Sequence, residues 1–267
     1  MLKQRVITAL VLATLTLSGV FLLPLTGLGF FVAVIIMLAA WEWANLSGFE
    51  QRSVRLVYAL VIGAFCCLTS FLSPFLTLGL AAAWWLIAFI LVKQYPQSGR
   101  LLESGPLSLL MGLLTLVPAW LGLYELKQMT GSAWLIVTLL AMVWAADCGA
   151  YFVGKRFGKT KLIERVSPKK TLEGLIGGVL VSMLISSLIT LFVNIGFLQG
   201  VSLLMLTILT VLVSVLGDLW ESVLKRHRKV KDSGSLLPGH GGVLDRIDSL
   251  TAAVPIFTLC VMIIGSV

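Results

Sequence analysis

Long apolar runs separated by short polar segments dominate the pattern of hydrophobic and polar positions along the chain. Nine of these runs are long enough to cross a bilayer as helices. We predict spans at residues 6–23, 28–46, 56–72, 75–92, 106–124, 133–152, 173–194, 202–224 and 250–266. The first run has a basic start like that of a signal peptide. It lacks a clear small-residue cleavage site, so we expect it to be kept as a helix.

Composition supports a membrane protein. Of the 267 residues, 58% are hydrophobic and 12% are charged, whereas a soluble domain carries about 25% charged residues. We therefore predict an all-α, polytopic integral membrane protein with about nine transmembrane helices. Almost all the acids suited to chemistry follow residue 146. We expect one membrane domain, 1–267, with scaffold helices in 1–130 and a catalytic half in 131–267.

The net charge of +8 has a simple explanation in a membrane protein. With the N-terminus in the cytoplasm, the basic loops 153–172 and 225–248 fall on the cytoplasmic side, and Lys127 is the one base outside. This asymmetry follows the positive-inside rule, and anionic membrane lipids are the expected neighbours. We expect no nucleic-acid partner, and we expect the polar, active-site face to be cytoplasmic.

The polar stretch Gly217–Ser249 interrupts the apolar pattern most strongly. It combines acids, a cluster of bases and a run with almost no side-chain bulk, Pro238–Gly242. Acids for a cation, bases for phosphates and glycines for close backbone approach are typical of a phosphate-handling site.

One polar stripe is predicted on the helix that leads into this stretch. Ser214, Asp218, Glu221, Ser222 and Lys225 recur at steps of about three and four, so they share a face.

Three aspartates are candidate metal ligands. Asp245 and Asp248 lie three apart at the start of the last helix, near its favourable N-terminus. Asp218 and Asp245 could grip one hard cation, for which oxygen ligands favour magnesium. The alternative is that these acids pair only with neighbouring bases. His240 could act as a general base, but its glycine neighbours favour a hydrogen-bond donor to phosphate.

Asp147 and Tyr151 form a second candidate patch. They lie four apart and share a helix face. An aspartate this close to hydrocarbon costs about 2.5–3.5 kcal/mol on insertion scales, so it needs a cation or a cavity. Pairing with Lys155 is the alternative.

Ser167-Pro168-Lys169-Lys170 forms a third candidate patch. Ser followed by Pro predicts a helix start. Two lysines in that first turn would oppose the helix dipole, which suggests a site for an anion. The alternative is a marker of cytoplasmic orientation. Gly177 and Gly178 are also compatible with close helix packing.

Glu42 is the one acid of the first half near membrane depth. Such an acid is a functional candidate by default. Pairing with Arg52 or Arg55 near the interface is the interpretation we favour.

The motifs together resemble phosphatidate cytidylyltransferases (CDP-diacylglycerol synthases). The main run is Ser222-x-x-Lys225-Arg226-x4-Lys231-Asp232-x5-Pro238-Gly239-His240-Gly241-Gly242-x2-Asp245-Arg246-x-Asp248. Two shorter runs also match, Ser167-Pro168-Lys169-Lys170-Thr171-x-Glu173-Gly174 and Asp147-x-Gly149-Ala150-Tyr151. The resemblance is specific over about residues 140–250.

The resemblance implies that CTP and phosphatidate react to CDP-diacylglycerol and pyrophosphate in phospholipid biosynthesis. It also implies a magnesium cofactor, potassium as an optional second cation, a homodimer, and a multi-pass location in a bacterial inner membrane. Asp218, Asp245, Lys225 and His240 are the expected catalytic residues, and Asp218, Asp245 and Asp248 the expected magnesium ligands. The expected substrate-binding residues are Asp147, Tyr151, Ser167, Lys169, Lys170, Ser222, Arg226, Lys231, Asp232, Gly241, Gly242 and Arg246.

Two other classes stay open. One is a CTP-dependent lipid kinase, or another membrane nucleotidyltransferase that uses a different lipid. The other is an anion transporter, which would place its charges near the midplane of broken helices, whereas here they cluster at predicted helix ends.

Overall fold

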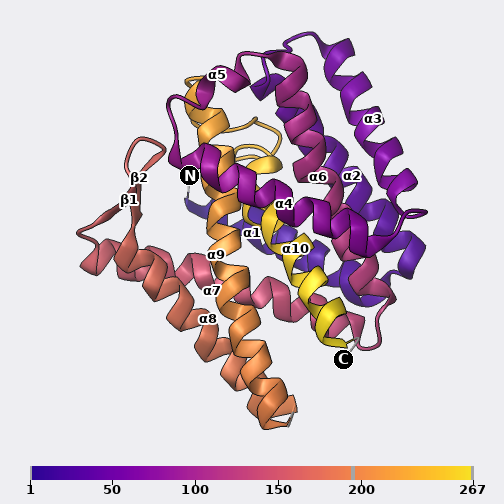
Figure 1. Ribbon diagram of the computed structural model, residues 1–267, viewed down its shortest axis with the longest axis vertical. Helices are drawn as coiled ribbons and strands as arrows, with labels where there is room; N and C mark the ends of the chain where they lie inside the picture. The colour runs from indigo at the N-terminus through magenta and orange to yellow at the C-terminus, as the bar shows by residue number, and fades with distance from the viewer. Residues whose placement is uncertain (1, 194–195, 266–267) are drawn as a thin grey trace.

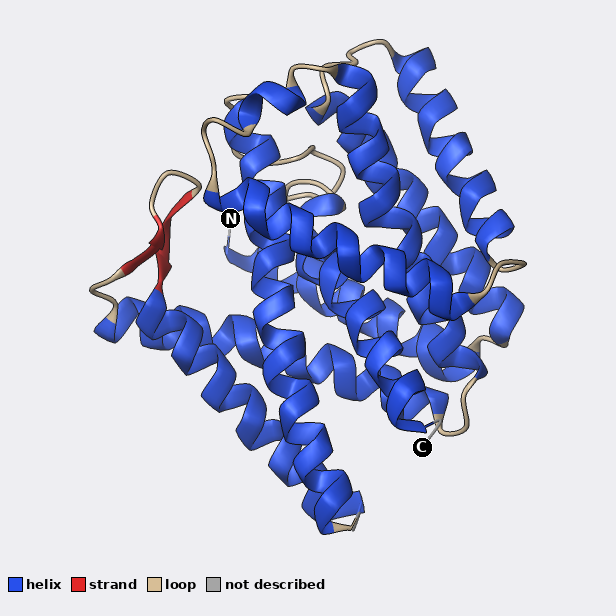
Figure 2. Cartoon of the chain, viewed as in Figure 1, coloured by secondary structure: helices blue, strands red, loops and turns tan. Residues whose placement is uncertain are grey.

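Helices make up nearly all of this protein. The computed structural model describes residues 2–193 and 196–265 (Figure 1). In chain order its elements are α1 (Leu2–Leu22), α2 (Leu25–Leu46), α3 (Arg52–Thr69), α4 (Pro74–Lys93), α5 (Gly99–Leu102), α6 (Gly105–Gln128), α7 (Ser132–Phe157), β1 (Lys161–Ile163), β2 (Ser167–Thr171), α8 (Leu172–Val193), α9 (Phe197–His227) and α10 (Leu244–Gly265). The two strands form a small hairpin at the edge of the molecule (Figure 2).

Eight helices of the described ranges are long and apolar enough to cross a membrane, namely α2–α4 and α6–α10. The apolar part of α1, Ile7–Leu22, is shorter. Large apolar side chains such as Phe30 and Leu86 are exposed on the outside of the bundle, as lipid-facing positions require. An all-α polytopic membrane protein is therefore confirmed, while the count of nine spans stays a prediction. The predicted span ends at 194 and 266 lie outside the described residues.

The basic segments meet at one end of the bundle. The Arg228 guanidinium lies 3.4 Å from the carboxylate of Glu50, which links the segment after α9 to the segment after α2. Arg226 Nε donates to the carbonyl of Val166 in the hairpin (3.2 Å). The segments that the sequence places on one side of the membrane thus lie together, and their cytoplasmic orientation stays a prediction.

The predicted helix start at Ser167-Pro168 is wrong. Ser167–Thr171 is strand β2, paired antiparallel with β1 through Lys161↔Thr171 and Ile163↔Ser167. A residue before proline is biased toward extended backbone, which favours a strand at Ser167. Helix α8 begins at Leu172, and the hydroxyl of Thr171 caps it by accepting a hydrogen bond from the N–H of Gly174 (3.1 Å).

The strand assignment changes the secondary structure in which the two lysines of that segment lie. Lys169 and Lys170 lie in β2, before α8, and not in the first turn of a helix. The two lysines therefore do not oppose the dipole of α8 from within its first turn. Their contacts with other residues indicate their roles.

Glycines let α7 and α8 pack closely. A methyl group added at Gly149 would lie 2.8 Å from the carbonyl oxygen of Gly177, and one added at Gly178 would lie 2.8 Å from that of Ala146. Backbone atoms cannot yield as a flexible side chain can, so side chains at these positions would push the helices apart. Close packing here fixes the end of α7 that carries Asp147 against the start of α8.

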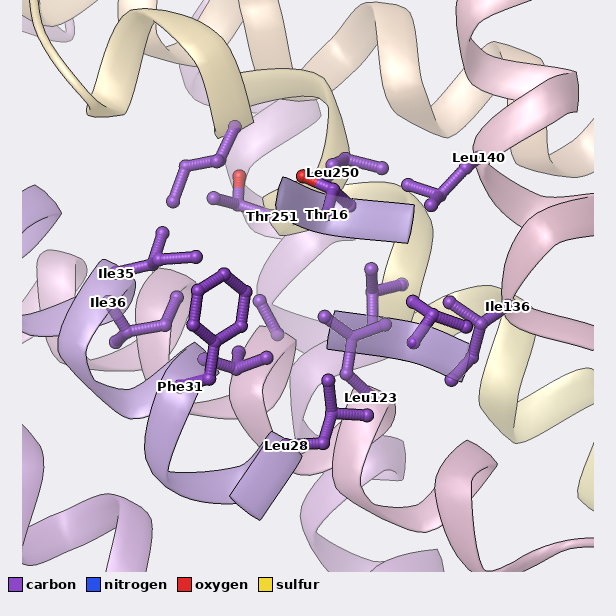
Figure 3. A pocket seen from close by; sticks show the side chains of 15 residues that line it. Thr16, Leu28, Phe31, Ile35, Ile36, Leu123, Ile136, Leu140, Leu250 and Thr251 are labelled. Carbon is purple, nitrogen blue, oxygen red and sulfur yellow. The ribbon is translucent and has the colours of Figure 1, made fainter. Parts of the chain in front are cut away.

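A small apolar cavity of about 100 Å³ lies between α1, α2, α6, α7 and α10 (Figure 3). Phe31, Leu123 and Ile136 line it, with hydroxyls from Thr16 and Thr251. None of its lining residues is charged. It is a packing gap beside α10 and does not suit a phosphate group.

The glycine contact gives a stability prediction. We expect Gly178→Ala to lower the free energy of unfolding by about 1–3 kcal/mol, because overpacking against backbone forces α7 and α8 to shift. Thermal unfolding in detergent measures the change. Gly79→Ala is the control, since an added methyl there meets nothing within 4 Å. Equal melting temperatures for the two variants would contradict the close contact.

Candidate active site

The predicted polar stripe is present at the end of α9. Ser222 Oγ donates to Asp218 Oδ1 (3.3 Å), and Lys225 Nζ pairs with the buried carboxylate of Glu221 one turn away. Ser214 is buried one turn before Asp218 in the same helix, and its hydroxyl donates to the backbone carbonyl of Val211 (2.8 Å). The acids and the base thus gather on the last three turns of α9, at the end of the bundle where the loops meet.

Lys170 connects the hairpin to this stripe. Its Nζ lies 2.7 Å from Asp218 Oδ2, and both side chains are about a quarter to a third exposed (25% and 30%). The neighbouring Lys169 is exposed. Of the two adjacent lysines, the structure therefore brings Lys170 into contact with the acids of α9.

Asp147 of α7 faces the same cluster. It is exposed, and it interacts electrostatically with Asp218, Lys170 and Arg246. These residues come from α9, β2 and α10. The three patches found in the sequence therefore meet in space, although they are separated by up to about a hundred residues along the chain.

Asp248 approaches Asp218 from α10. The two carboxylates interact electrostatically, and Asp248 also interacts with Glu221, Lys225 and Lys170. Asp248 Oδ1 accepts a hydrogen bond from the N–H of Ser249 (2.7 Å). Within the described ranges no base forms an ion pair with Asp248.

The close approach of α9 and α10 has a local cause. A methyl group added at Gly217 would collide with the carbonyl oxygen of Asp248. The absence of a side chain at Gly217 lets the two helices touch one residue before Asp218. This contact places the two carboxylates beside each other.

Asp245 has a different environment from Asp248, although it lies one turn away. Its Oδ1 pairs with Lys225 Nζ (2.8 Å). Its Oδ2 accepts hydrogen bonds from the N–H groups of Ser233 (2.9 Å) and Gly242 (2.8 Å), and it lies 3.0 Å from Ser233 Oγ. Both oxygens of Asp245 thus hold the segment between α9 and α10 to the two helices.

That segment forms a tight turn around His240. Gly239 and Gly241 have positive φ angles of 75° and 83°, a conformation that glycine adopts without strain. Leu237 N–H donates to Gly241 O (2.9 Å), and Arg246 Nη2 donates to His240 O (2.9 Å). The turn is therefore held at its base, and Thr8 Oγ1 of α1 also donates to its Pro238 O (3.2 Å).

A polar pocket of about 650 Å³ opens beside this turn. Its lining includes Lys231, Asp232, Arg246, the glycines and His240, whose Nδ1 is buried without a hydrogen-bond partner in the described part of the chain. Two cations and an unpartnered imidazole nitrogen around an open cavity suit an anionic ligand.

Some predicted site residues lie outside these contacts. Tyr151 is 60% exposed, with its ring against Phe152 at 5.4 Å between centroids. Arg226 is exposed and bonds to the hairpin at Val166, and Ser167 lies at the start of β2. Their assignment to a binding site stays a prediction.

The chain matches the model of the cytidylyltransferase family over residues 3–264. The chain belongs to the cytidylyltransferase family. It is 46% identical to the phosphatidate cytidylyltransferase of Pseudomonas aeruginosa over 264 residues, or 96% of each chain. It is 38% identical to that of Haemophilus influenzae over 281 residues, which cover 97% of this chain and 98% of the relative. With that of Bacillus subtilis it shares 46% identity over 114 residues, 43% of this chain.

The acids of this cytidylyltransferase-family protein fit one way of binding magnesium. No group of three or more His, Cys, Asp or Glu side chains within residues 2–193 and 196–265 converges as a complete metal site. Magnesium is commonly held by one or two carboxylates, with water and substrate phosphates as its other ligands. Asp218 and Asp248 provide such a pair. Asp245 fits less well, because its Oδ1 pairs with Lys225 and its Oδ2 is within hydrogen-bonding distance of three protein donors, whereas Asp218 has one protein donor on each oxygen.

Glu42 is the site residue that sequence reasoning misplaced. The pairing we favoured, with Arg52 or Arg55, is not among the ion pairs of the described residues, although Arg55 interacts electrostatically with Glu42 at longer range. Arg55 instead lies 4.2 Å above the Trp41 ring and donates to Trp41 O (3.0 Å). Glu42 is buried against the segment between α9 and α10. The signal available in the sequence was the depth of this acid in an apolar helix. The sequence could not identify its partners, because they lie about 200 residues away.

The Lys170–Asp218 contact can be tested with two adjacent lysines. We expect Lys170→Gln to loosen the hairpin from α9, to which Arg226 still bonds it, and to raise the rate of trypsin cleavage after Arg165 about fivefold. That factor corresponds to the ~1 kcal/mol of a partly exposed ion pair. Lys169→Gln is the matched control and is expected to leave the rate unchanged. The same rate in both variants would show that the ion pair does not hold the hairpin.

Proposed function

We propose that this protein is a phosphatidate cytidylyltransferase, which converts CTP and phosphatidate into CDP-diacylglycerol and pyrophosphate. The identity shared with enzymes of that name over nearly the whole chain supports the proposal. The observation that carries it is the position of the acid cluster. Leu219, next to Asp218, lines an apolar groove, and Arg246, which interacts with Asp147, lines a polar pocket, as a reaction between a lipid and a nucleotide requires.

The polar pocket is the proposed place for the nucleotide phosphates. Lys231, Arg246 and the partnerless His240 Nδ1 line it. Arg246 also interacts electrostatically with Asp147, so the pocket borders the acid cluster. Bases neutralise the triphosphate there, and the backbone of the glycine turn can approach it closely because it has no side chains. The pocket lining includes Asp232 and Gly241, and Gly242 follows Gly241 in the turn.

The apolar groove is the proposed route for the lipid. It has a volume of about 640 Å³ and runs between α4, α9 and α10, with Leu162 and Ile163 of β1 at one end. Leu219, the neighbour of Asp218, also lines it, so the groove passes close to the acid cluster. Lys93 belongs to its lining, where an ammonium group suits the phosphate of a lipid whose acyl chains lie in the groove.

The chemistry we propose is a displacement at the α-phosphorus of CTP. A phosphate oxygen of phosphatidate forms the new bond to this phosphorus, and the bond to the bridging oxygen of pyrophosphate breaks. The nucleophile is already an anion, so no base has to remove a proton from it. Catalysis therefore consists of alignment and of neutralising repelling phosphates. Lys170 is the base best placed for this beside the acids, and Lys225 holds Asp245 and Glu221 in position.

Asp218 and Asp248 are the proposed magnesium ligands, and Asp245 orders the neighbouring turn. When bound, magnesium would screen the phosphate charge and favour departure of pyrophosphate. Asp147 is the residue we assign to a second cation such as potassium, or to the nucleotide. Ser222 orients Asp218 through its hydrogen bond (3.3 Å).

The proposed location is the bacterial inner membrane, with the N-terminus and the polar end of the bundle in the cytoplasm. The basic loops support this orientation through the positive-inside rule. We also propose a homodimer, as the resemblance implies.

Pyrophosphate release tests the reaction. Detergent-purified protein is incubated with CTP, phosphatidate and magnesium, and with each of them left out in turn. We expect release to require all three and a CDP-lipid to appear as product. Release with a polyprenol or diacylglycerol in place of phosphatidate would support the lipid-kinase or other nucleotidyltransferase alternative. No release by folded protein would overturn the proposal.

Two substitutions test the metal assignment. We expect Asp218→Asn and Asp248→Asn each to lower kcat by at least about 100-fold, because each removes a charge that faces the phosphates. Their melting temperatures should change little, since Asp218→Asn gives up only the partly exposed ion pair with Lys170 and no base of the described ranges pairs with Asp248. Glu103→Gln, an exposed acid at the same end of the bundle, is the control. Near-normal turnover in either aspartate variant would remove that residue from the magnesium role.

A further inference from the structure

Glu42 is a buried acid whose contacts lie in the segment next to the acid cluster. Its side chain is 1% exposed. Its carboxylate lies 2.9 Å from Ser233 Oγ, and it accepts hydrogen bonds from the N–H groups of Val243 (3.1 Å) and Leu244 (2.9 Å). Leu244 is the first residue of α10. A side chain of α2 thus caps the helix that carries Asp245 and Asp248.

Ser233 continues this contact toward the acids. Its hydroxyl lies within hydrogen-bonding distance of both Glu42 Oε2 and Asp245 Oδ2 (2.9 and 3.0 Å), and its N–H donates to the same oxygen of Asp245 (2.9 Å). Asp245 in turn pairs with Lys225 of α9. An unbroken chain of polar contacts therefore joins α2, the segment between α9 and α10, and both acid-bearing helices.

The backbone of the segment between α9 and α10 lies very close to the Glu42 carboxylate. A methyl group added at Gly234 would collide with Glu42 Oε1, and one added at Gly242 would collide with Glu42 Oε2. The segment therefore touches the carboxylate at two points where only glycine fits. Two glycines at the two points of contact are not expected if the segment packs against the carboxylate by chance.

The charge of Glu42 is met by hydrogen-bond donors in direct contact, while Arg55 interacts with it only at longer range. None of the ion pairs in the described ranges includes Glu42. Two N–H groups at the start of α10 point at it, and a helix N-terminus favours a negative charge. A neutral amide would turn an NH₂ donor toward one of these N–H donors, so the contact requires a carboxylate.

We propose that Glu42 is a positioning residue for the nucleotidyl transfer: it fixes Ser233 and the start of α10, and through them the orientation of Asp245 and Asp248. It does not touch the substrates. The inference rests on the proposed function of the acid cluster. It also gives the N-terminal half of the chain a part in the site, although that half was expected to serve as scaffold.

The test compares two acid-to-amide substitutions near the end of α2. We expect Glu42→Gln to lower kcat per folded molecule roughly 10- to 100-fold, because misplacement of about 1 Å at a reacting centre costs up to that much. Amide hydrogen exchange should rise in residues 233–245 and stay unchanged in α3 and α4. Glu50→Gln is the control: its carboxylate is 81% exposed and loses only the long contact with Arg228, so neither quantity should change measurably.

Two further variants separate positioning from a purely structural role. Glu42→Asp keeps the charge and should recover part of kcat. Ser233→Ala combined with Glu42→Gln should be little worse than Glu42→Gln alone, because the two residues act through one contact. If Glu42 only supports folding, the yield of folded protein falls while kcat per folded molecule stays normal, and this result would overturn the proposal.

Gly234→Ala carries the test if Glu42→Gln yields no folded protein. It leaves Glu42 in place and presses a methyl group against the carboxylate from the loop side, so the same loss of kcat is expected. Normal turnover in folded Gly234→Ala would then refute the proposal. If the unchanged protein forms no CDP-lipid, the proposed function fails separately, and hydrogen exchange in residues 233–245 still decides whether Glu42 anchors this segment.

Discussion

Backbone N–H and C=O groups in hydrocarbon have to be hydrogen-bonded within the protein, because no water is present to bond them. Eight helices of the described ranges meet this requirement along lengths that can cross a bilayer. The chain leaves the helical form between them, and there the backbone needs other partners. The hairpin of β1 and β2 and the segment between α9 and α10 are such places. Polar chemistry gathers at this end of the bundle because both backbone and charged side chains can be satisfied there.

The acids at that end are satisfied to different degrees. Glu42 and Asp245 are surrounded by N–H donors, and Asp245 also by a lysine. Asp218 has one lysine and one hydroxyl, while Asp147 and Asp248 interact mainly with charges at longer range. A carboxylate with full hydrogen bonding holds structure in place, whereas one with spare capacity can accept a cation. This difference in the number of hydrogen-bond partners separates the acids that organise the site from those that suit a metal.

Close helix contacts hold this arrangement in place. Gly217 lets α9 touch α10 beside the two aspartates, and Gly178 lets α8 touch α7 beside Asp147. In a membrane, helices gain no hydrophobic driving force from meeting each other, so tight packing of small residues contributes much of their association. The same contacts that hold the bundle together therefore also set the distances between the acids.

The sequence by itself determined the fold class, the approximate positions of the eight helices that can cross a membrane and the polar stripe of α9, because bilayer thickness and helical period act locally along the chain. It also indicated the family, through the motifs that begin at Asp147, Ser167 and Ser222. Tertiary structure decided that Lys170 and not Lys169 meets Asp218, that Ser167 begins a strand, and that Glu42 caps α10. These outcomes depend on partners that are distant in sequence, and the energy of a hydrogen bond or ion pair is set by where both groups lie after the helices have packed.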